Sequence, residues 1–125
     1  MNDQANKLFN KAVEKLNEAN EELFRPEEDV VTYMVCKNAQ NAIENYLKGF
    51  LFNNGIDPSS FKTIDNLYEQ CKKINHKFEK IDLSNFSCKS HKLDSRYCNE
   101  VSKASNCFDI ADNIDTFLRQ ECIIN

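Results

Sequence analysis

Residue types that β-rich folds depend on are scarce in this sequence. The chain has 125 residues but only two glycines, two prolines and no tryptophan. β-Sandwiches and barrels need a turn about every ten residues, and glycine and proline are the strongest turn formers. Their scarcity argues against an all-β fold and favours helices.

Long apolar runs are also missing. No stretch of about 18 consecutive apolar residues occurs, so no segment is suited to span a bilayer. Residues 1–7 lack the apolar core of a secretory signal. The composition, 41% hydrophobic and 29% charged, is typical of a folded protein. We therefore expect a single domain over residues 1–125, cytoplasmic and without membrane contact.

Six cysteines raise the question of disulfides. An even number is compatible with a disulfide framework, but the sequence has neither a secretory signal nor a Cys-x-x-Cys pair. A free cysteine on an apolar helix face packs as a small hydrophobic residue. We therefore expect all six to be reduced thiols. Those that fall on predicted apolar helix faces are Cys36, Cys71, Cys107 and Cys122.

Apolar residues recur every three or four positions in four stretches of the sequence. The second stretch is the longest and most apolar, which favours a central helix with neighbours on several sides. Pro26 suits the first position of that helix, and Gly55 suits the residue after its end. The four predicted helices cover residues 3–24, 26–53, 63–78 and 99–122.

Short connections between these helices predict an all-α fold, a four- to five-helix up-and-down bundle. Ile43 is expected in the core of the second helix. A short helical turn is expected to cover one end of the bundle with Phe78, Ile81, Leu83 and Phe86. On the last helix, the residues expected to face the core are Ala104, Cys107, Phe108, Ala111, Ile114 and Leu118.

Motifs for catalysis and metal binding are missing. The sequence has no glycine-rich phosphate loop, no His-Glu-x-x-His and no nucleophile elbow. His76 and His91 are neither at ligand spacing from two cysteines nor part of a Glu-x-x-His pair. The acids Asp109, Asp112 and Asp115 are expected on a solvated helix face. We therefore expect no metal and no cofactor.

Charge is unevenly divided along the chain. Residues 72–103 contain eight basic and four acidic residues, whereas the rest contains eight basic and sixteen acidic ones. A basic segment in a chain of net charge −4 indicates contact with the phosphates of a nucleotide or RNA. The alternative is a solvated loop that simply carries lysines. The predicted contacts to nucleotide or RNA are Lys89, Lys92, Arg96, Tyr97 and Lys103.

The order of several features resembles a known family. Residues 39–51 read AQNAIENYLKGFL, Asn-Gly-Ile follows at 54–56, and an Arg-Tyr pair at 96–97 precedes the last predicted helix. These features resemble the HEPN family of small helical bundles over about residues 8–118. The resemblance implies a four- or five-helix bundle, often a homodimer, in defence, toxin–antitoxin and RNA-processing systems.

Catalytic members of that family are metal-independent ribonucleases in which a histidine follows an arginine by a few residues. Here no histidine follows Arg96, and His91 stands before it. The resemblance therefore favours a non-catalytic module that binds a protein partner, such as a minimal nucleotidyltransferase, or a nucleotide or RNA. The alternatives are a metal-independent ribonuclease that uses Arg96 and His91 across a dimer, and a helical adaptor without a ligand.

Overall fold

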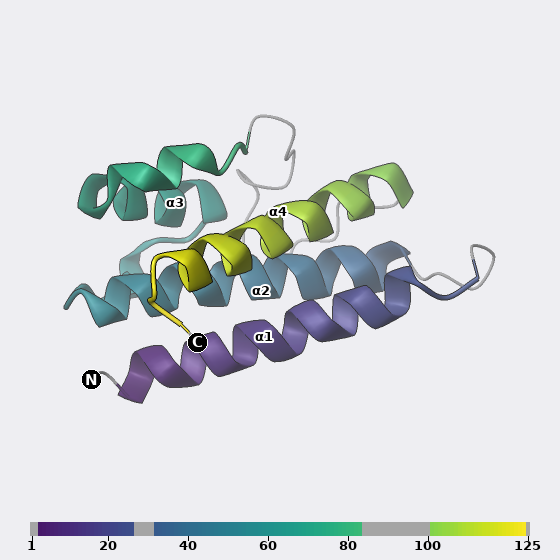
Figure 1. The fold of residues 1–125 in the computed structure, drawn as a ribbon, viewed down its shortest axis with the longest axis horizontal. Helices are drawn as coiled ribbons and strands as arrows, with labels where there is room; N and C mark the ends of the chain where they lie inside the picture. The colour runs from purple at the N-terminus through teal and green to yellow at the C-terminus, as the bar shows by residue number, and fades with distance from the viewer. Residues whose placement is uncertain (1–2, 27–31, 84–100, 125) are drawn as a thin grey trace.

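The fold is known from a computed structural model that describes residues 3–26, 32–83 and 101–124. Within these ranges the chain is helical, and the predicted all-α bundle is confirmed (Figure 1). The α-helices are α1 (Asp3–Leu23), α2 (Thr32–Asn53), α3 (Ile64–Ile74) and α4 (Val101–Gln120). Two short 3₁₀ helices complete the described elements, η2 (Pro58–Ser60) and η3 (His76–Lys80).

The central helix of the bundle is α2, as its wide apolar face predicts. It packs against α1, α3 and α4. α1 runs antiparallel to α2, and α4 runs in the same direction as α2 (Figure 1). The start of α1 and the end of α4 therefore lie at the same end of the molecule. Ile43, predicted to be in the core, is fully buried.

The second helix begins later than predicted. Pro26 is not helical, and α2 begins at Thr32. The chain already leaves α1 before the proline, because the Arg25 N–H donates to the carbonyl of Glu22 (3.3 Å) in a 3₁₀-type turn. A residue that precedes proline is also disfavoured in the α conformation. α1 therefore ends at Leu23, ahead of Pro26, and Pro26 is not part of α2.

The third helix ends earlier than predicted, at Ile74 instead of residue 78. Asn75 has an extended backbone (φ −139°), and its side chain accepts a hydrogen bond from the N–H of Lys77 (3.0 Å). Asparagine competes with helix formation through such local bonds. The chain therefore turns at Asn75 and continues as the separate helix η3.

Phe78 on η3 closes one end of the core, as predicted. Its side chain is 0% exposed, and its ring centroid lies 4.8 Å from that of Phe50 and 4.7 Å from that of Phe117. The Tyr68 hydroxyl lies within hydrogen-bond distance of the carbonyls of Phe78 (3.0 Å) and Ile81 (2.7 Å). Ile81 and Leu83 are buried as well. The fourth residue of the predicted cover, Phe86, lies outside the described residues.

The apolar face of α4 is wider than predicted. Cys107, Ala111, Ile114 and Leu118 are buried as expected, whereas Phe108 is only half-buried at the edge of the core. Ile110 and Phe117, which were not predicted to face inward, are buried. The reason is that α4 packs both on α2 and against Phe78 of η3, so that a second side of the helix is covered. The side chain of Ala104 is not described.

Gly49 lets α1 approach α2 closely. A Cβ atom at this position would stand 2.6 Å from the ring of Phe9, a side chain of the core. No Cβ atom fits at that distance unless the ring moves. The glycine in the middle of α2 therefore serves the packing of two helices, despite the lower helix propensity of glycine.

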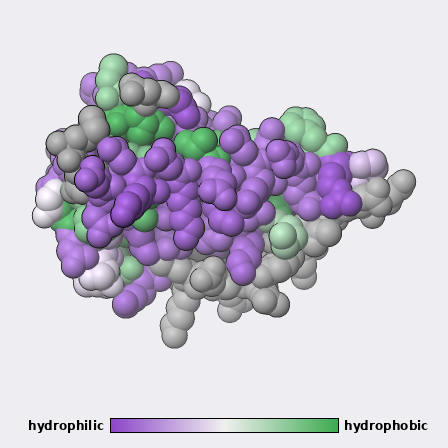
Figure 2. Space-filling model, turned by 90° about the horizontal axis from the view of Figure 1, so that it is seen from below, coloured by the Kyte–Doolittle hydropathy of each residue, from purple (hydrophilic) through white to green (hydrophobic). Residues whose placement is uncertain are grey.

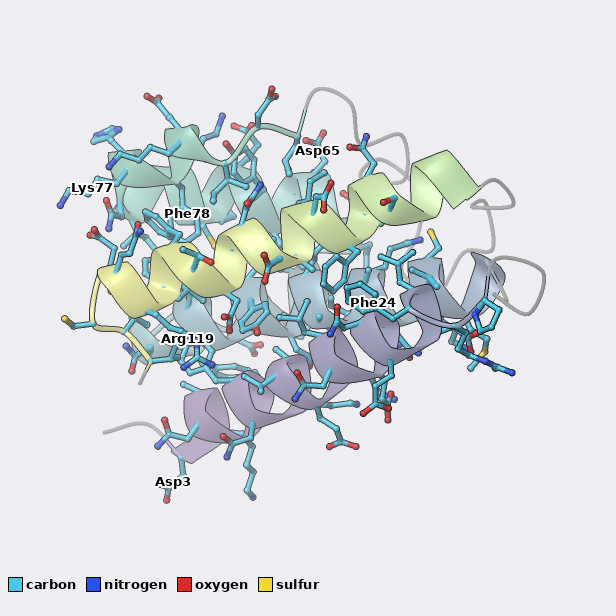
Figure 3. The ribbon with its side chains drawn as sticks, turned by 45° about the vertical axis from the view of Figure 1, so that its right-hand side comes forward. Asp3, Phe24, Asp65, Lys77, Phe78 and Arg119 are labelled. Carbon is cyan, nitrogen blue, oxygen red and sulfur yellow. The ribbon has the colours of Figure 1, made fainter. Side chains whose placement is uncertain are left out.

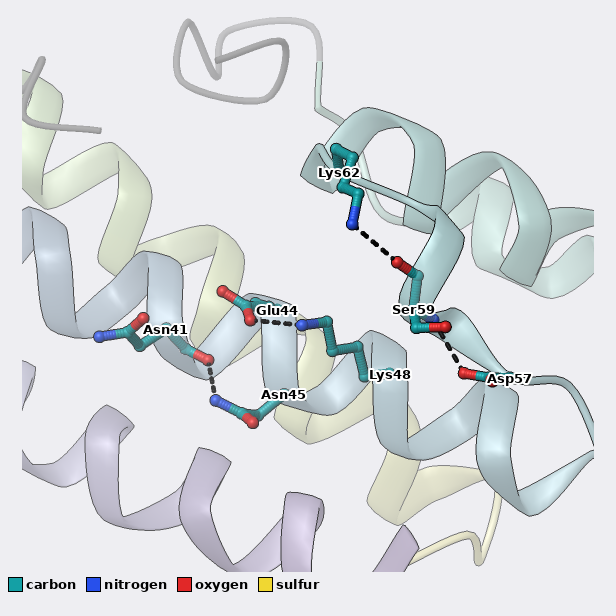
Figure 4. Close-up of polar contacts among 7 residues, drawn as sticks. All are labelled: Asn41, Glu44, Asn45, Lys48, Asp57, Ser59 and Lys62. Atoms are coloured by element: carbon teal, nitrogen blue, oxygen red, sulfur yellow. Dashed lines mark hydrogen bonds and ion pairs between the residues drawn. The ribbon is translucent and has the colours of Figure 1, made fainter. Parts of the chain in front are cut away.

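Polar contacts satisfy the outer side of α2 and the turn that follows it (Figure 4). Lys48 and Glu44 form an ion pair of 2.7 Å one helical turn apart, and the Asn45 amide donates to the carbonyl of Asn41 (2.7 Å). Asp57 caps η2 by accepting a hydrogen bond from the N–H of Ser59 (3.0 Å). The Lys48–Glu44 and Asn45 contacts are partly buried and the Asp57 cap is exposed, and together they keep these polar groups satisfied.

Hydrophilic residues cover most of the face shown in Figure 2, with small apolar patches between them. Among the described residues, no helix is long and apolar enough to cross a membrane.

The prediction that all cysteines are reduced is wrong for Cys36, which is disulfide-bonded in the structure. Its Sγ atom also lies 3.5 Å from that of Cys107, at the buried contact between α2 and α4. Helical periodicity placed Cys36 in the core but could not show which sulfur atoms share that part of it. Cys71 and Cys107 are buried and reduced as expected, whereas the reduced thiol of Cys122 is exposed beyond the end of α4. Cys88 and Cys98 lie outside the described residues.

We expect Phe78→Ala to lower the free energy of unfolding by about 3–5 kcal/mol, because it removes a buried ring that contacts two others. Phe24→Ala is the matched control: its ring is 79% exposed, so the change should stay within about 0.5 kcal/mol. Urea denaturation followed by circular dichroism measures both. Equal losses in the two variants would contradict the position given to Phe78.

Candidate functional site

Most of the residues predicted to contact a nucleotide or RNA are not described by the structure. Lys103 lies in the first turn of α4, but its side chain is not described. These assignments and the ribonuclease alternative therefore stay predictions. The residues concerned that lie outside the described ranges are Lys89, His91, Lys92, Arg96 and Tyr97.

The described part of the basic segment lies on α3 and η3. Lys72 is paired with Glu69 (2.9 Å), and Lys77 is paired with Glu121 beyond the end of α4 (3.3 Å). Nearby carboxylates thus balance part of the positive charge of this surface. The other basic residues here, all exposed, are Lys73, His76 and Lys80.

A polar network links the core to the molecular surface. Tyr46 on α2 is 0% exposed, and its hydroxyl donates to Asp115 Oδ1 at 2.6 Å. Asp115 Oδ2 accepts a hydrogen bond from Arg119 Nε at 2.9 Å, one turn further along α4. The network thus connects the middle of the central helix with an arginine at the end of α4.

This network positions the side chain of Arg119 and does not supply an acid or a base. Burial, followed by the hydrogen bond to Asp115, raises the pKa of the Tyr46 hydroxyl far above its ordinary value. The hydroxyl therefore stays protonated and donates, and cannot act as a general base near neutral pH. The hydrogen bond to Asp115 also raises the pKa of Arg119. Asp115 consequently holds a permanently charged guanidinium group in a fixed place.

Sequence analysis placed Asp115 on a solvated face with Asp109 and Asp112, and this is wrong for Asp115. The other two acids are exposed as expected, but Asp115 lies at the border of the apolar face, beside the buried Ile114. The available signal was the spacing of four between Asp115 and Arg119, which puts both on one side of a helix. The partner on α2 could not be found from spacing.

A cavity of about 510 Å³, which we call the end pocket, lies beside Arg119. Figure 3 shows Arg119 between the end of α4 and the first half of α1. After α4 the chain turns back, with the Ile123 N–H donating to the carbonyl of Leu118 (2.9 Å). The residues that line the pocket are Asn6, Phe9, Asn10, Val13, Arg119, Ile123 and Ile124.

A second hollow, of about 660 Å³, lies between the end of α1 and the start of α2; we call it the hairpin groove. Exposed Phe24 lies at this end of α1 (Figure 3). Met34, which lines the groove, is 41% exposed. The groove is lined by Lys15, Glu18, Glu21, Glu22, Arg25, Met34 and Asn38.

The charged residues around the hairpin groove are mostly acidic. The acids in the last turn of α1 are unfavourably placed, because they lie at the negative end of the helix. Lys15 pairs with Glu18 (3.0 Å) and Arg25 with Glu22 (3.2 Å), which leaves the carboxylate of Glu21 in excess. The last turn of α1 contains no basic residue. Because the carboxyl end of a helix is negative, acids in that turn are disfavoured. Local electrostatics therefore favour a cation at this end of α1.

In the described part of the chain, no group of three or more His, Cys, Asp or Glu side chains is arranged to hold a metal ion. Burial raises the pKa of the Cys71 thiol, which opposes formation of a reactive thiolate.

A bundle of four α-helices is what the family resemblance implies, and a family model tests the resemblance directly. The family model for the HEPN domain matches residues 5–121. The chain belongs to the HEPN domain family. Neither a curated protein nor a solved structure matches this HEPN domain.

In this HEPN domain, Tyr46→Phe keeps the buried ring and removes only the hydroxyl that donates to Asp115. We expect the free energy of unfolding at pH 7 to fall by about 1.5–3 kcal/mol, the range for hydrogen bonds to charged groups. Asp112→Asn, an exposed acid on the same helix, should change it by less than about 0.5 kcal/mol. Denaturant titration tests this, and a neutral Tyr46→Phe would contradict the network.

The same variant has a pH signature. Because the pKa of Tyr46 is raised in the folded state, its contribution is complete below the ordinary tyrosine pKa of 10.0 and declines at higher pH. The wild type should therefore lose more stability than Tyr46→Phe as the pH rises above 10.

Proposed function

We propose that this HEPN domain is a non-catalytic module that binds a protein partner through the hairpin groove. The partner surface would carry basic and apolar side chains, and a minimal nucleotidyltransferase is the partner class we favour. The observation that supports this is exposed Met34 in the lining of a groove with excess negative charge, with exposed Phe24 at the same end of α1.

Charge complementarity argues for a basic partner. Glu21 and Glu22 lie in the last turn of α1, next to helix carbonyls that lack a basic side chain. A lysine or arginine from a partner would neutralise Glu21 and interact favourably with this helix end. The same carboxylates would repel the phosphates of a nucleic acid, so the groove suits a protein.

Apolar contact argues for a protein as well. Phe24 is 79% exposed, and an exposed aromatic ring is a frequent anchor of protein interfaces. Met34 adds a flexible apolar side chain that adapts to different partner surfaces. Together these residues would supply the apolar part of an interface whose rim is acidic.

Support for a non-catalytic role comes from the pKa values of side chains that could otherwise act as a base or a nucleophile. Tyr46 and Cys71 have raised pKa values, so neither provides a base or a thiolate near neutral pH. In the sequence no histidine follows Arg96. We further propose that the module acts in the cytoplasm as a homodimer, in a toxin–antitoxin or defence system, in keeping with its family.

Co-expression with a minimal nucleotidyltransferase should give a complex that elutes as one species in size-exclusion chromatography. Glu21→Lys and Phe24→Ser should each weaken binding at least about tenfold, which corresponds to roughly 1.4 kcal/mol. Glu14→Lys makes the same charge change on an exposed residue of α1 that does not line the groove, and should bind as the wild type does. Calorimetric titration of the purified proteins measures all four affinities.

Absence of a complex, or equal weakening by Glu14→Lys and Glu21→Lys, would contradict the proposed use of the groove. In the second case only the net charge of the domain would matter.

Nucleotide or RNA binding through the basic segment is the second candidate function. The exposed lysines Lys73 and Lys80 support it. Binding of labelled RNA should then weaken as salt rises, and Arg96→Ala should weaken it most. Metal-independent cleavage in EDTA that is lost in Arg96→Ala or His91→Ala would instead select the ribonuclease. If neither RNA nor the nucleotidyltransferase binds, the helical adaptor remains.

A further inference from the structure

Asn38 on α2 is a buried polar side chain, only 8% exposed. The other buried amides of this helix are satisfied, since that of Gln40 lies 3.0 Å from Cys36 Sγ and that of Asn45 donates to the carbonyl of Asn41. Within residues 3–26, 32–83 and 101–124, no hydrogen bond is made by the side chain of Asn38. Buried polar groups nearly always have a partner, so this exception calls for an explanation.

The amide of Asn38 opens into the hairpin groove. In the described part of the chain, no fully enclosed side-chain nitrogen or oxygen atom lacks a hydrogen bond. The polar atoms of Asn38 must therefore reach the surface, and the hollow that this residue lines is the hairpin groove. A ligand in the groove would supply the missing hydrogen bond.

The surroundings of this amide combine negative charge with an apolar side chain. Met34 lies one helical turn before Asn38 on α2 and lines the groove beside it. On the α1 side, the two cations of the lining are each paired with a glutamate. The carboxylate of Glu21 is left in excess, so the groove holds a buried amide, a negative charge and an apolar side chain.

We propose that the hairpin groove receives a lysine side chain of the protein partner. Its ammonium group would bind the amide oxygen of Asn38 and the carboxylate of Glu21, and its methylene stem would lie along Met34. This inference rests on the proposed function, because it identifies the partner residue that the groove recognises. Asn38 is accordingly a specificity-determining residue of the interface.

An ammonium group satisfies both acceptors at once. It carries three N–H donors and no acceptor, so it can donate to an amide oxygen on α2 and to a carboxylate on α1. A neutral hydroxyl or amide would satisfy Asn38 but leave the charge of Glu21 unbalanced. A phosphate or carboxylate would be repelled by Glu21. A cationic donor also forms stronger hydrogen bonds than a neutral one.

The burial of Asn38 makes this contact more effective than an ion pair on the surface alone. Exposed ion pairs contribute little, because water screens them. A hydrogen bond to a group that is largely withdrawn from water is stronger. Asn38 also stands on the central helix next to the fully buried Ala39, so little side-chain freedom remains to be lost on binding.

The first test needs no partner protein. It is an NMR titration of the ¹⁵N-labelled full chain with N-acetyl-lysine N-methylamide, in which the amide signals of the groove residues should shift and saturate. The norleucine derivative keeps the stem without the charge, and the trimethyllysine derivative keeps the charge without an N–H donor. Each should bind at least about tenfold more weakly. The proposal is overturned if either equals the lysine derivative, or if the lysine derivative does not saturate below roughly 50 mM.

Variants of Asn38 test the direction of the hydrogen bond. Asn38→Leu has a similar volume without an acceptor and should weaken binding of the lysine derivative at least about tenfold. Asn38→Asp keeps the acceptor and should bind at least as tightly as the wild type; weaker binding would mean that the amide donates, and would overturn the proposal. Asn45→Leu removes another buried amide of α2 that does not line the groove, and should bind as the wild type does.

Glu21→Gln keeps the test decisive if a variant of Asn38 does not fold, which circular dichroism shows. This exposed residue should tolerate the change, and binding should weaken about two- to fivefold. Glu14→Gln, the same change outside the groove, should have no effect. Equal affinities for the two variants would overturn the role of Glu21.

Calorimetric titration with the minimal nucleotidyltransferase separates this inference from the proposed function. Weaker binding of Asn38→Leu, with Asn45→Leu unchanged, supports both. Wild-type affinity of Asn38→Leu, with Glu21→Lys still weakened, overturns the lysine contact and leaves the groove as the interface. Absence of a complex contradicts the proposed partner, and the titration with the lysine derivative then decides whether the groove recognises an ammonium group.

Discussion

The packing of α2 against α1, α3 and α4 leaves almost no part of this helix in water from Val35 to Leu51. Such burial requires that neighbouring helices come close, and Gly49 meets this need by making room for the ring of Phe9. On its other side, Phe50 of α2 contacts the ring of Phe78, which fixes η3 over the end of the core. Every other element is therefore placed by its contact with α2.

One consequence is that the two hollows described above lie at the two ends of α1. The inward face of α1 is occupied by its contact with α2. The first half of the helix meets the end of α4 and forms the end pocket, and the second half meets the start of α2 and forms the hairpin groove. The two hollows differ in charge: the charged residue of the end pocket, Arg119, is paired with Asp115, whereas Glu21 leaves an excess negative charge in the hairpin groove.

A further consequence concerns the buried hydroxyl of Tyr46. A tyrosine on the central helix needs a hydrogen-bond partner once it is buried, and Asp115 on α4 supplies it. The same carboxylate fixes Arg119, so satisfaction of a polar group in the core also orients a cation at the surface. Core packing and the end pocket are thus coupled through a single side chain.

Periodicity predicted the four helices and the burial of Ile43, because both follow from the repeat of the α-helix. Phe78 is buried as expected, but it lies on η3 and not on the predicted third helix. Periodicity failed where contacts between segments far apart in the sequence determine which side chains are buried. Phe117 is buried in preference to Phe108 because η3 covers a second side of α4, and η3 exists because Asn75 ends α3.

The candidate sites could be predicted only in part. The acidic end of α1 is visible in the sequence, as is the spacing of Asp115 and Arg119. The apposition of Arg119 with Asn6, and of Asp115 with Tyr46, joins residues far apart in the chain. Local patterns hold no information on such pairs, and this also explains the wrong prediction for Cys36.

The central claim is that α2 organises the bundle, and native-state hydrogen exchange tests it most directly. Amides that open only on global unfolding exchange most slowly. The account predicts that the slowest amides of the protein lie in α2 between Ala39 and Leu51, with α3 exchanging faster because it packs on α2 along one side. Slower exchange in α1 or α3 than in α2 would contradict the account.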